Sequence, residues 1–203
     1  IGRIEAWLRE VKQPPYPYPI DQAKAVAGGN VYARYCAACH GANGDDFAPK
    51  AGLPQVACLK PGESEDIYGP VIGKITRIEE VATDRRRLDS FTALLATNMG
   101  TPYAGTAYRF CNYRKTFGYA NMPLDGVWLR APYLHNGSVP TLRDLLEPSA
   151  NRPKSFYRGN DVYEPVKVGF VADVAEEGSR KYFRFDTGIA GNGNQGHEGK
   201  AYG

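Results

Sequence analysis

Five consecutive residues, Cys36-Ala37-Ala38-Cys39-His40, carry the most specific chemistry in this chain. The spacing Cys-x-x-Cys-His is the attachment signature of a c-type haem. Two thiols on one helical turn add to the vinyl groups of the porphyrin, and the adjacent imidazole then binds the iron. The motif therefore predicts one covalent haem c, attached through Cys36 and Cys39, with His40 as the proximal iron ligand.

Two other kinds of site use a pair of cysteines at this spacing. A thioredoxin-like redox centre expects a βαβ setting and no adjacent histidine, and a structural zinc site needs a second pair of ligands. The sequence offers neither, so haem attachment is the preferred interpretation.

The second axial ligand of the iron decides what such a haem does. Methionine gives a high-potential electron carrier, and a second histidine commonly gives a lower potential. An open position permits peroxide or oxygen chemistry. Residue types alone do not choose among the candidates, which are His135, His197, Met99, Met122 and, more weakly, the tyrosines.

A helix and the turn after it must present the motif. Asp21 can cap a helix that delivers Cys36 near its end, with apolar side chains on one face. These side chains are Ala23, Val26, Ala27, Val31, Tyr32 and Tyr35. Gly41, Asn43 and Gly44 then break the helix.

Composition favours a small domain rich in loops. The 203 residues include 23 glycines and 15 prolines, so we expect a mainly α fold with long Gly- and Pro-rich loops and little β structure. The net charge of +3 is too small to indicate nucleic acid, and Arg85-Arg86-Arg87 is interpreted as a solvated turn. No stretch approaches the roughly 20 apolar residues that a membrane-spanning helix needs.

The first 19 residues differ from the rest of the chain. Their apolar residues have the spacing of an amphipathic helix, and four prolines then predict a stiff linker. These residues are Ile1, Ile4, Trp7, Leu8 and Val11, followed by Pro14, Pro15, Pro17 and Pro19. We therefore expect residues 1–19 to lead out of a preceding region and residues 20–203 to form the haem domain. The absence of an initial Met or a signal-peptide pattern indicates a processed chain or a fragment.

Two cysteines, Cys58 and Cys111, lie outside the haem motif. An even remainder in an exported protein is compatible with a disulfide, and the alternative is a pair of buried free thiols. Because covalent haem attachment belongs to export pathways, we expect a periplasmic or otherwise extracytoplasmic location.

Residues 118–142, GYANMPLDGVWLRAPYLHNGSVPTL, look like a segment of the diheme cytochrome c peroxidase superfamily. The chain most closely resembles the C-terminal haem domain of its bacterial rubber oxygenase-like branch. The resemblance covers most of residues 20–203, because further matches follow in the expected order. These are Pro19-Ile20-Asp21, Thr83-Asp84, Arg152-Pro153, Phe156, Gly159, Val168-Gly169-Phe170 and GNGNQGH at 191–197.

The resemblance implies roles for individual residues. His197 would be the distal haem ligand, because it takes the place of the histidine in the family's late glycine- and asparagine-rich loop. His135 would lie beside the haem or contact a propionate, with Arg130 and Tyr133 in the same surroundings. Trp128 would pack at the haem edge. For these last three residues an ordinary core or surface role is the alternative.

A Gly- and Asn-rich loop also suits a haem ligand on physical grounds. Glycines let the backbone approach a porphyrin closely and adopt positive φ. Side-chain amides can hold such a loop by hydrogen bonds. The residues available for this are Asn192, Asn194 and Gln195.

The chain departs from the family in two ways. It has one Cys-x-x-Cys-His motif where the family's chemistry needs two haems, and it lacks the C-terminal helix that usually packs against the N-terminal one. We therefore expect single-electron transfer with a redox protein or a second haem domain, through an iron ligated by His40 and His197. One alternative is a haem oxidoreductase of peroxidase or oxygenase type, in which His197 is off the iron. Another is a structural module whose haem stabilises the fold.

Overall fold

The computed structural model of the protein describes residues 4, 7, 10–42, 74–102, 104–106 and 115–202. Its helices are α2 (Gln22–Tyr35), α3 (Ala37–His40), α4 (Ile78–Val81), α5 (Arg86–Ser90), α6 (Ala93–Gly100) and α7 (Leu142–Leu145). Its 3₁₀ turns are η2 (Val127–Leu129), η3 (Ser149–Asn151) and η4 (Lys200–Tyr202). Its strands are β1 (Ile75–Arg77), β2 (Gly118–Ala120), β3 (Ser155–Arg158), β4 (Tyr163–Glu164), β5 (Gly169–Phe170), β6 (Glu176–Glu177), β7 (Arg180–Lys181) and β8 (Phe183–Asp186).

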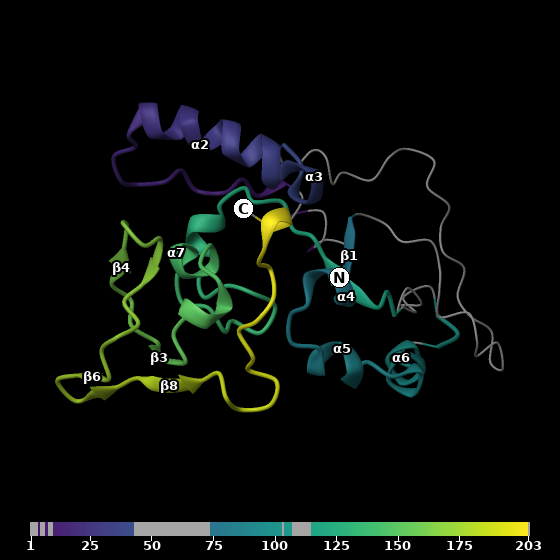
Figure 1. Ribbon diagram of the computed structural model, residues 1–203. Helices are drawn as coiled ribbons and strands as arrows, with labels where there is room; N and C mark the ends of the chain where they lie inside the picture. The colour runs from purple at the N-terminus through teal and green to yellow at the C-terminus, as the bar shows by residue number, and fades with distance from the viewer. Residues whose placement is uncertain are drawn as a thin grey trace.

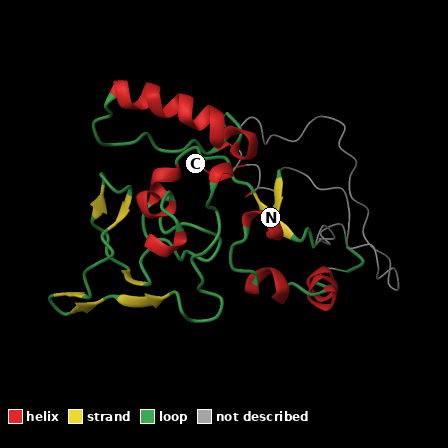
Figure 2. Cartoon of the chain, viewed as in Figure 1, coloured by secondary structure: helices red, strands yellow, loops and turns green. Residues whose placement is uncertain are grey.

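The expectation of a mainly α fold with little β structure is wrong. Of the residues that the structure describes, 32% are helical and 16% are in strands, and the helices are short (Figure 2). The strands form four antiparallel pairs, β1–β2, β3–β8, β4–β5 and β6–β7. Stretches expected to be open loops pair into short ribbons instead, because pairing satisfies backbone N–H and C=O groups that burial would otherwise leave unbonded.

Helix α2 begins and ends as the sequence predicts. The Oδ1 atom of Asp21 accepts a hydrogen bond from the backbone N–H of Lys24 at 3.1 Å, which caps the first turn. The helix runs along one side of the molecule to α3 (Figure 1). None of its side chains is buried, and Val26 and Val31 are 69% and 54% exposed. Its apolar face is therefore not covered by the described part of the protein.

The buried core belongs mainly to the second half of the chain. Phe156 on β3 faces Phe185 on β8, with ring centroids 5.1 Å apart, and both side chains are buried. Val139 is fully buried and pairs with Tyr133 through backbone hydrogen bonds. Among the described residues the other buried apolar side chains are Ile78, Leu88 and Tyr182.

The proline-rich N-terminal segment lies against the strand pair β4–β5. Tyr18 stacks on Tyr163 with centroids 5.5 Å apart, and Trp128 meets both Tyr16 and Tyr163 edge-on. The hydroxyl of Tyr16 donates to the carbonyl of Pro165. These four rings, of Tyr16, Tyr18, Trp128 and Tyr163, form an aromatic cluster that anchors this segment to the rest of the chain.

Residues before this segment are described in part. Residues 4, 7 and 10 are helical, as the spacing predicts, and the side chains of Ile4 and Trp7 are exposed. Ile1 and Leu8 lie outside the described residues. No helix in the described ranges is both long and apolar enough to cross a membrane.

Candidate haem site

The Cys-x-x-Cys-His motif occupies a bend and one helical turn at the end of α2. Cys36 closes α2 by donating its backbone N–H to Tyr32, and α3 then carries Cys39 and His40. The backbone N–H groups of Cys39 and His40 both donate to the carbonyl of Cys36, at 3.1 and 2.9 Å. Both thiols are free and partly exposed. Burial, and then the charge of Cys39, raises the pKa of Cys36, so this thiol is protonated at neutral pH.

The chain turns sharply after His40. Gly41 has a φ of 70°, in the left-handed region that glycine adopts at no steric cost. The hydroxyl of Tyr32, on the last turn of α2, donates to the carbonyl of Gly41 at 2.6 Å. The predicted helix break at Gly41 is confirmed, whereas Asn43 and Gly44 lie outside the described residues. Cys58 and Cys111 also lie outside the described residues, and with them the choice between a disulfide and two free thiols.

The ring of His40 is oriented by a backbone carbonyl. Its Nδ1 lies 2.7 Å from the carbonyl oxygen of Met122, so Nδ1 carries the proton and donates. This tautomer leaves Nε2 with a free lone pair, which is the arrangement of metal-binding histidines. Met122 itself takes part through its backbone, and its side chain is 56% exposed.

Arg130 braces the turn that follows Met122. Its guanidinium donates to the carbonyls of Pro123 and Asp125, both at 2.8 Å. The exposed Arg130 therefore supports the loop that orients His40.

His197 lies beside His40, although the two are far apart in the sequence. Their ring centroids are 6.2 Å apart and their planes are inclined by 52°. A metal–imidazole bond is about 2 Å and the nitrogen-to-centroid distance roughly 1 Å, so two rings on opposite sides of one metal have centroids about 6 Å apart. The observed separation matches that of two axial imidazoles on one iron.

The environment of the His197 ring also fits a metal ligand. Its Nδ1 is buried and has no hydrogen-bond partner among the described residues. Burial lowers the pKa of His197, and the charges of His40 and Arg152 lower it further. The ring is therefore neutral at pH 7, which is the form that binds metal.

The backbone around His197 is held against the segment after α4. His197 has a φ of 52° and donates its N–H to the carbonyl of Val81 at 2.9 Å. Gly196 has a φ of 85°, and a Cβ there would lie 2.5 Å from the Thr83 nitrogen and the Val81 oxygen. The ring of Tyr202 in η4 packs 4.7 Å from that of His197. The loop can approach this closely only because residue 196 is glycine.

Side-chain amides anchor the loop at 191–197, as the sequence suggested for two of them. Asn192 donates to the carbonyl of Asp186 and Asn194 to that of Pro153. Gln195 is exposed. Asn136, which sequence reasoning missed, donates to the carbonyls of Gly191 and Gly193.

Arg152 is the second residue that sequence reasoning missed. It is buried, and its guanidinium donates to carbonyls at the end of α7 and in the His197 loop. The only available signal was its place in the Arg-Pro pair of the family resemblance, which gave it no role.

The other predicted site residues have protein partners in the structure. The hydroxyl of the buried Tyr133 is within hydrogen-bond distance of the carbonyls of Val127 and Val168, and burial raises its pKa. The indole of Trp128 lies in the aromatic cluster and donates to the carbonyl of Pro14 at 3.4 Å. Both side chains contribute to packing in the structure.

His135 lies next to Thr83, whose backbone touches Gly196. Its Nδ1 is 3.1 Å from the Thr83 hydroxyl, and its ring stacks on Tyr119 with centroids 4.1 Å apart. Its Nε2 is buried without a hydrogen-bond partner among the described residues. Arg87 donates to its carbonyl. Burial lowers the pKa of His135.

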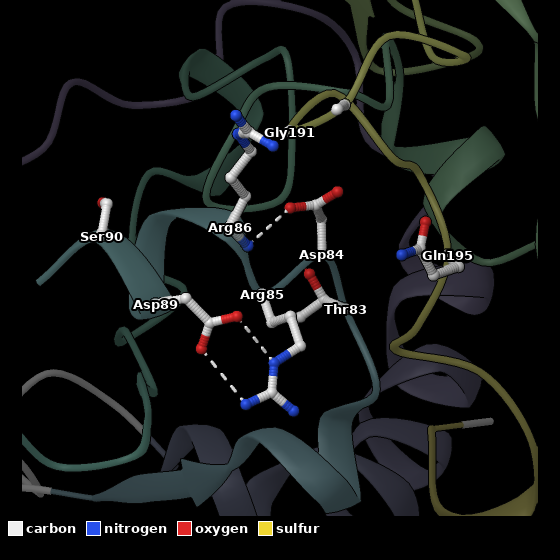
Figure 3. Close-up of a pocket in the computed structure, with 9 residues that line it drawn as sticks. Thr83, Asp84, Arg85, Arg86, Asp89, Ser90, Gly191 and Gln195 are labelled. Carbon is white, nitrogen blue, oxygen red and sulfur yellow. Dashed lines mark hydrogen bonds and ion pairs between the residues drawn. The ribbon is translucent and has the colours of Figure 1, made fainter.

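A shallow hollow of about 630 Å³ lies at the start of α5 (Figure 3). Arg85 pairs with Asp89 at 2.9 Å, and the backbone N–H of Arg86 donates to Asp84. The remaining lining residues are Thr83, Ser90, Ala190, Gly191 and Gln195. Its lining includes neither the haem motif nor His197.

The side chains of the Cys-x-x-Cys-His motif and of His197 fit a haem better than a bare metal ion. Within the described ranges, no group of three or more His, Cys, Asp or Glu side chains could hold a metal ion. A haem needs only two axial ligands from the protein, because the porphyrin supplies the other four. His40 and His197 would be these ligands, and Cys36 and Cys39 would carry the thioether bonds.

Comparison with known proteins agrees with this chemistry. Residues 118–157 match the family described as RoxA-like, cytochrome c-like. Two proteins of Sinorhizobium fredii (strain NBRC 101917 / NGR234) are similar over most of the chain. Uncharacterized protein y4iJ is 31% identical over 88% of this chain and 34% of its own length. Uncharacterized protein y4iM is 33% identical over 87% of this chain and 40% of its own length.

The chain thus spans between a third and two fifths of the length of these relatives. The segment matched by the family contains Met122, which orients His40, and Arg152, which holds the His197 loop. The match supports a cytochrome c-like domain and indicates haem binding and a role in electron transfer.

Proposed function

We propose that this chain is a c-type cytochrome domain that transfers single electrons through one haem c. Cys36 and Cys39 attach the haem, and His40 and His197 bind its iron. The observation that carries the proposal is the 6.2 Å separation of the two imidazole rings. These residues come from opposite ends of the described chain, so local sequence does not bring them together.

Backbone groups hold the two histidines of this site in position. The Met122 carbonyl fixes the tautomer and direction of His40. The hydrogen bond from the backbone N–H of His197 to the carbonyl of Val81 fixes the position of the His197 backbone. When bound, the haem supplies a reversible one-electron couple at the iron. If His40 and His197 both held the iron, their imidazoles would leave no open position there for peroxide or oxygen.

The family resemblance supports a more specific setting. We place the chain in the diheme cytochrome c peroxidase superfamily, near the rubber oxygenase-like branch. We propose a second haem domain or a separate redox protein as the electron partner; the relatives extend well beyond the region that this chain matches. The attachment chemistry supports a periplasmic or otherwise extracytoplasmic location.

Spectroscopy of the oxidised protein tests the ligand assignment. We expect low-temperature EPR and absorption spectra of low-spin, bis-imidazole iron in the wild type. The variant His197→Ala should become high-spin, because it loses the sixth ligand. His135→Ala is the matched control and should stay low-spin.

Two results would contradict the proposal. A high-spin wild type would favour the peroxidase or oxygenase alternative. A low-spin His197→Ala protein would mean that another residue binds the iron, and the His135→Ala spectrum would show whether that residue is His135.

A further inference from the structure

The guanidinium of Arg152 uses every donor it has. Its side chain is 2% exposed, and arginine carries five N–H groups in a planar fork. Each can meet one of five backbone carbonyl oxygens, at distances between 2.5 and 3.3 Å. The acceptors belong to Leu145, Glu147, Asn194, Gly196 and His197.

These acceptors come from two separate parts of the fold. Leu145 and Glu147 lie at the end of α7, and the other three carbonyls lie in the loop that ends at His197. Nε and Nη2 reach α7, while Nη1 and Nη2 reach the loop. Arg152 therefore ties the position of His197 to that of α7.

The charge of Arg152 is not neutralised by a direct ion pair. No carboxylate in the described ranges lies within ion-pair distance of it, and carbonyl dipoles surround the cation instead. The nearest acidic influences come from Glu198 and Asp144. Glu198 accepts hydrogen bonds from the backbone of Ser149 and Gly196, so it serves the same loop.

We propose that Arg152 is a positioning residue that holds His197 on the haem iron through its planar set of hydrogen bonds. This inference rests on the proposed function, because it assumes that His197 is the distal ligand. Lysine keeps the charge but offers only three donors on a point-like head, so Arg152→Lys separates geometry from charge.

Cyanide titration of the oxidised holoprotein measures the strength of the His197–iron bond. Cyanide can bind a six-coordinate iron only by displacing a ligand, so its apparent affinity rises as that bond weakens. We expect Arg152→Lys to bind cyanide roughly 10–100-fold more tightly than the wild type, because loss of a group that orients a metal ligand commonly weakens metal binding by that factor. His197→Ala sets the upper limit. Arg184→Lys, at an exposed ion pair on β8, is the matched control and should match the wild type.

Added imidazole checks that the variant is folded. If Arg152→Lys has lost only the placement of His197, excess imidazole should convert any high-spin fraction of its iron to the low-spin form. An Arg152→Lys protein with wild-type cyanide affinity would overturn the inference. So would one that imidazole does not restore, because the damage would then extend beyond His197.

The same titration keeps the two proposals apart. If His197→Ala and the wild type bind cyanide equally, the ligand assignment itself fails. If they differ and Arg152→Lys matches the wild type, the assignment stands and only the role of Arg152 fails.

Discussion

At the residue scale, the position of His197 depends on its neighbour Gly196. The φ of 85° and the 2.5 Å approach of an added Cβ to Thr83 and Val81 leave no room for a side chain. We expect Gly196→Ala to lift the loop, to give high-spin iron and to lower the free energy of unfolding by about 1–3 kcal/mol. EPR and urea unfolding of the oxidised holoprotein measure the two effects.

Gly199→Ala is the matched control for this change. Gly199 has a similar φ of 91°, but nothing lies within 4 Å of an added Cβ. In this variant the positive φ should lower the free energy of unfolding, while the iron should stay low-spin. If both variants remain low-spin, close packing at Gly196 does not hold the ligand.

The half-buried imidazole of His135 predicts a pH dependence of stability. Burial lowers its pKa in the folded protein; Asp84 opposes this shift and Arg87 adds to it. The unfolded chain binds a proton near pH 6.5, so below that pH it binds more protons than the folded chain. This contribution to stability is therefore lost as the pH falls from 6.5 through the lowered pKa.

Replacing His135 tests this sign directly. The free energy of unfolding of His135→Gln should fall less steeply than that of the wild type between pH 7 and pH 5. Urea titrations at several pH values give the two slopes. Equal slopes would mean that His135 does not contribute to the acid sensitivity.

Sequence alone predicted some of these residues and missed others for a physical reason. The haem motif is recognisable because attachment needs fixed residue types at fixed spacing. The meeting of His197 with His40 followed only from a family resemblance, because no local pattern encodes a contact between distant loops. Arg152 acts through backbone carbonyls that every residue has, so its sequence context gives no sign of its partners.

At the element scale, the aromatic cluster holds the proline-rich segment in place. Trp128 contacts Tyr16 and Tyr163 edge-on and donates to Pro14. Each such aromatic pair contributes roughly 0.5–1.5 kcal/mol beyond burial. We expect Trp128→Leu to speed hydrogen exchange in residues 11–20 and to leave the haem spectrum unchanged, because the cluster has no contact with His40 or His197.

Trp7→Leu is the control, since Trp7 is 62% exposed and should not affect exchange in that segment. Hydrogen exchange followed by mass spectrometry measures both variants. A changed haem spectrum in Trp128→Leu would contradict this prediction and would indicate that Trp128 packs at the haem edge, as the family resemblance suggested.

The elements show why helix positions were easier to predict than strands. A cap at Asp21 and a break at Gly41 act within a few residues, and both are confirmed. The strands are two to four residues long, too short to show alternation of apolar and polar residues. Phe156 pairs with Phe185, which is far away in the sequence. Local sequence patterns therefore do not predict the β3–β8 ribbon.

At the scale of the whole molecule, the haem motif and the core belong to different parts of the chain. No side chain of α2 is buried, whereas Phe156 and Phe185 bury each other between β3 and β8. We expect a haem-free protein, made by Cys36→Ala and Cys39→Ala together, to lose hydrogen-exchange protection in α2 and α3. Strands β3 and β8 should keep theirs, because their packing does not involve the haem.

Mass spectrometry of peptides from the two regions, with and without haem, measures this difference. Cys39→Ser alone, which leaves one thiol for attachment, is an intermediate case between the wild type and the haem-free protein. Equal loss of protection in both regions would show that haem and core form one cooperative unit.

The order of the ligands along the chain has a consequence for how the protein is made. Both thiols and His40 lie within five residues near the beginning, while Arg152 and His197 come near the end. On the proposed assignment, a chain synthesised from its N-terminus can receive haem long before its second axial ligand exists. During that interval the site would have His40 but not yet His197 to hold the iron. On that assignment, the loop at 191–197 and Arg152 would complete the haem site only after the attachment motif has been made.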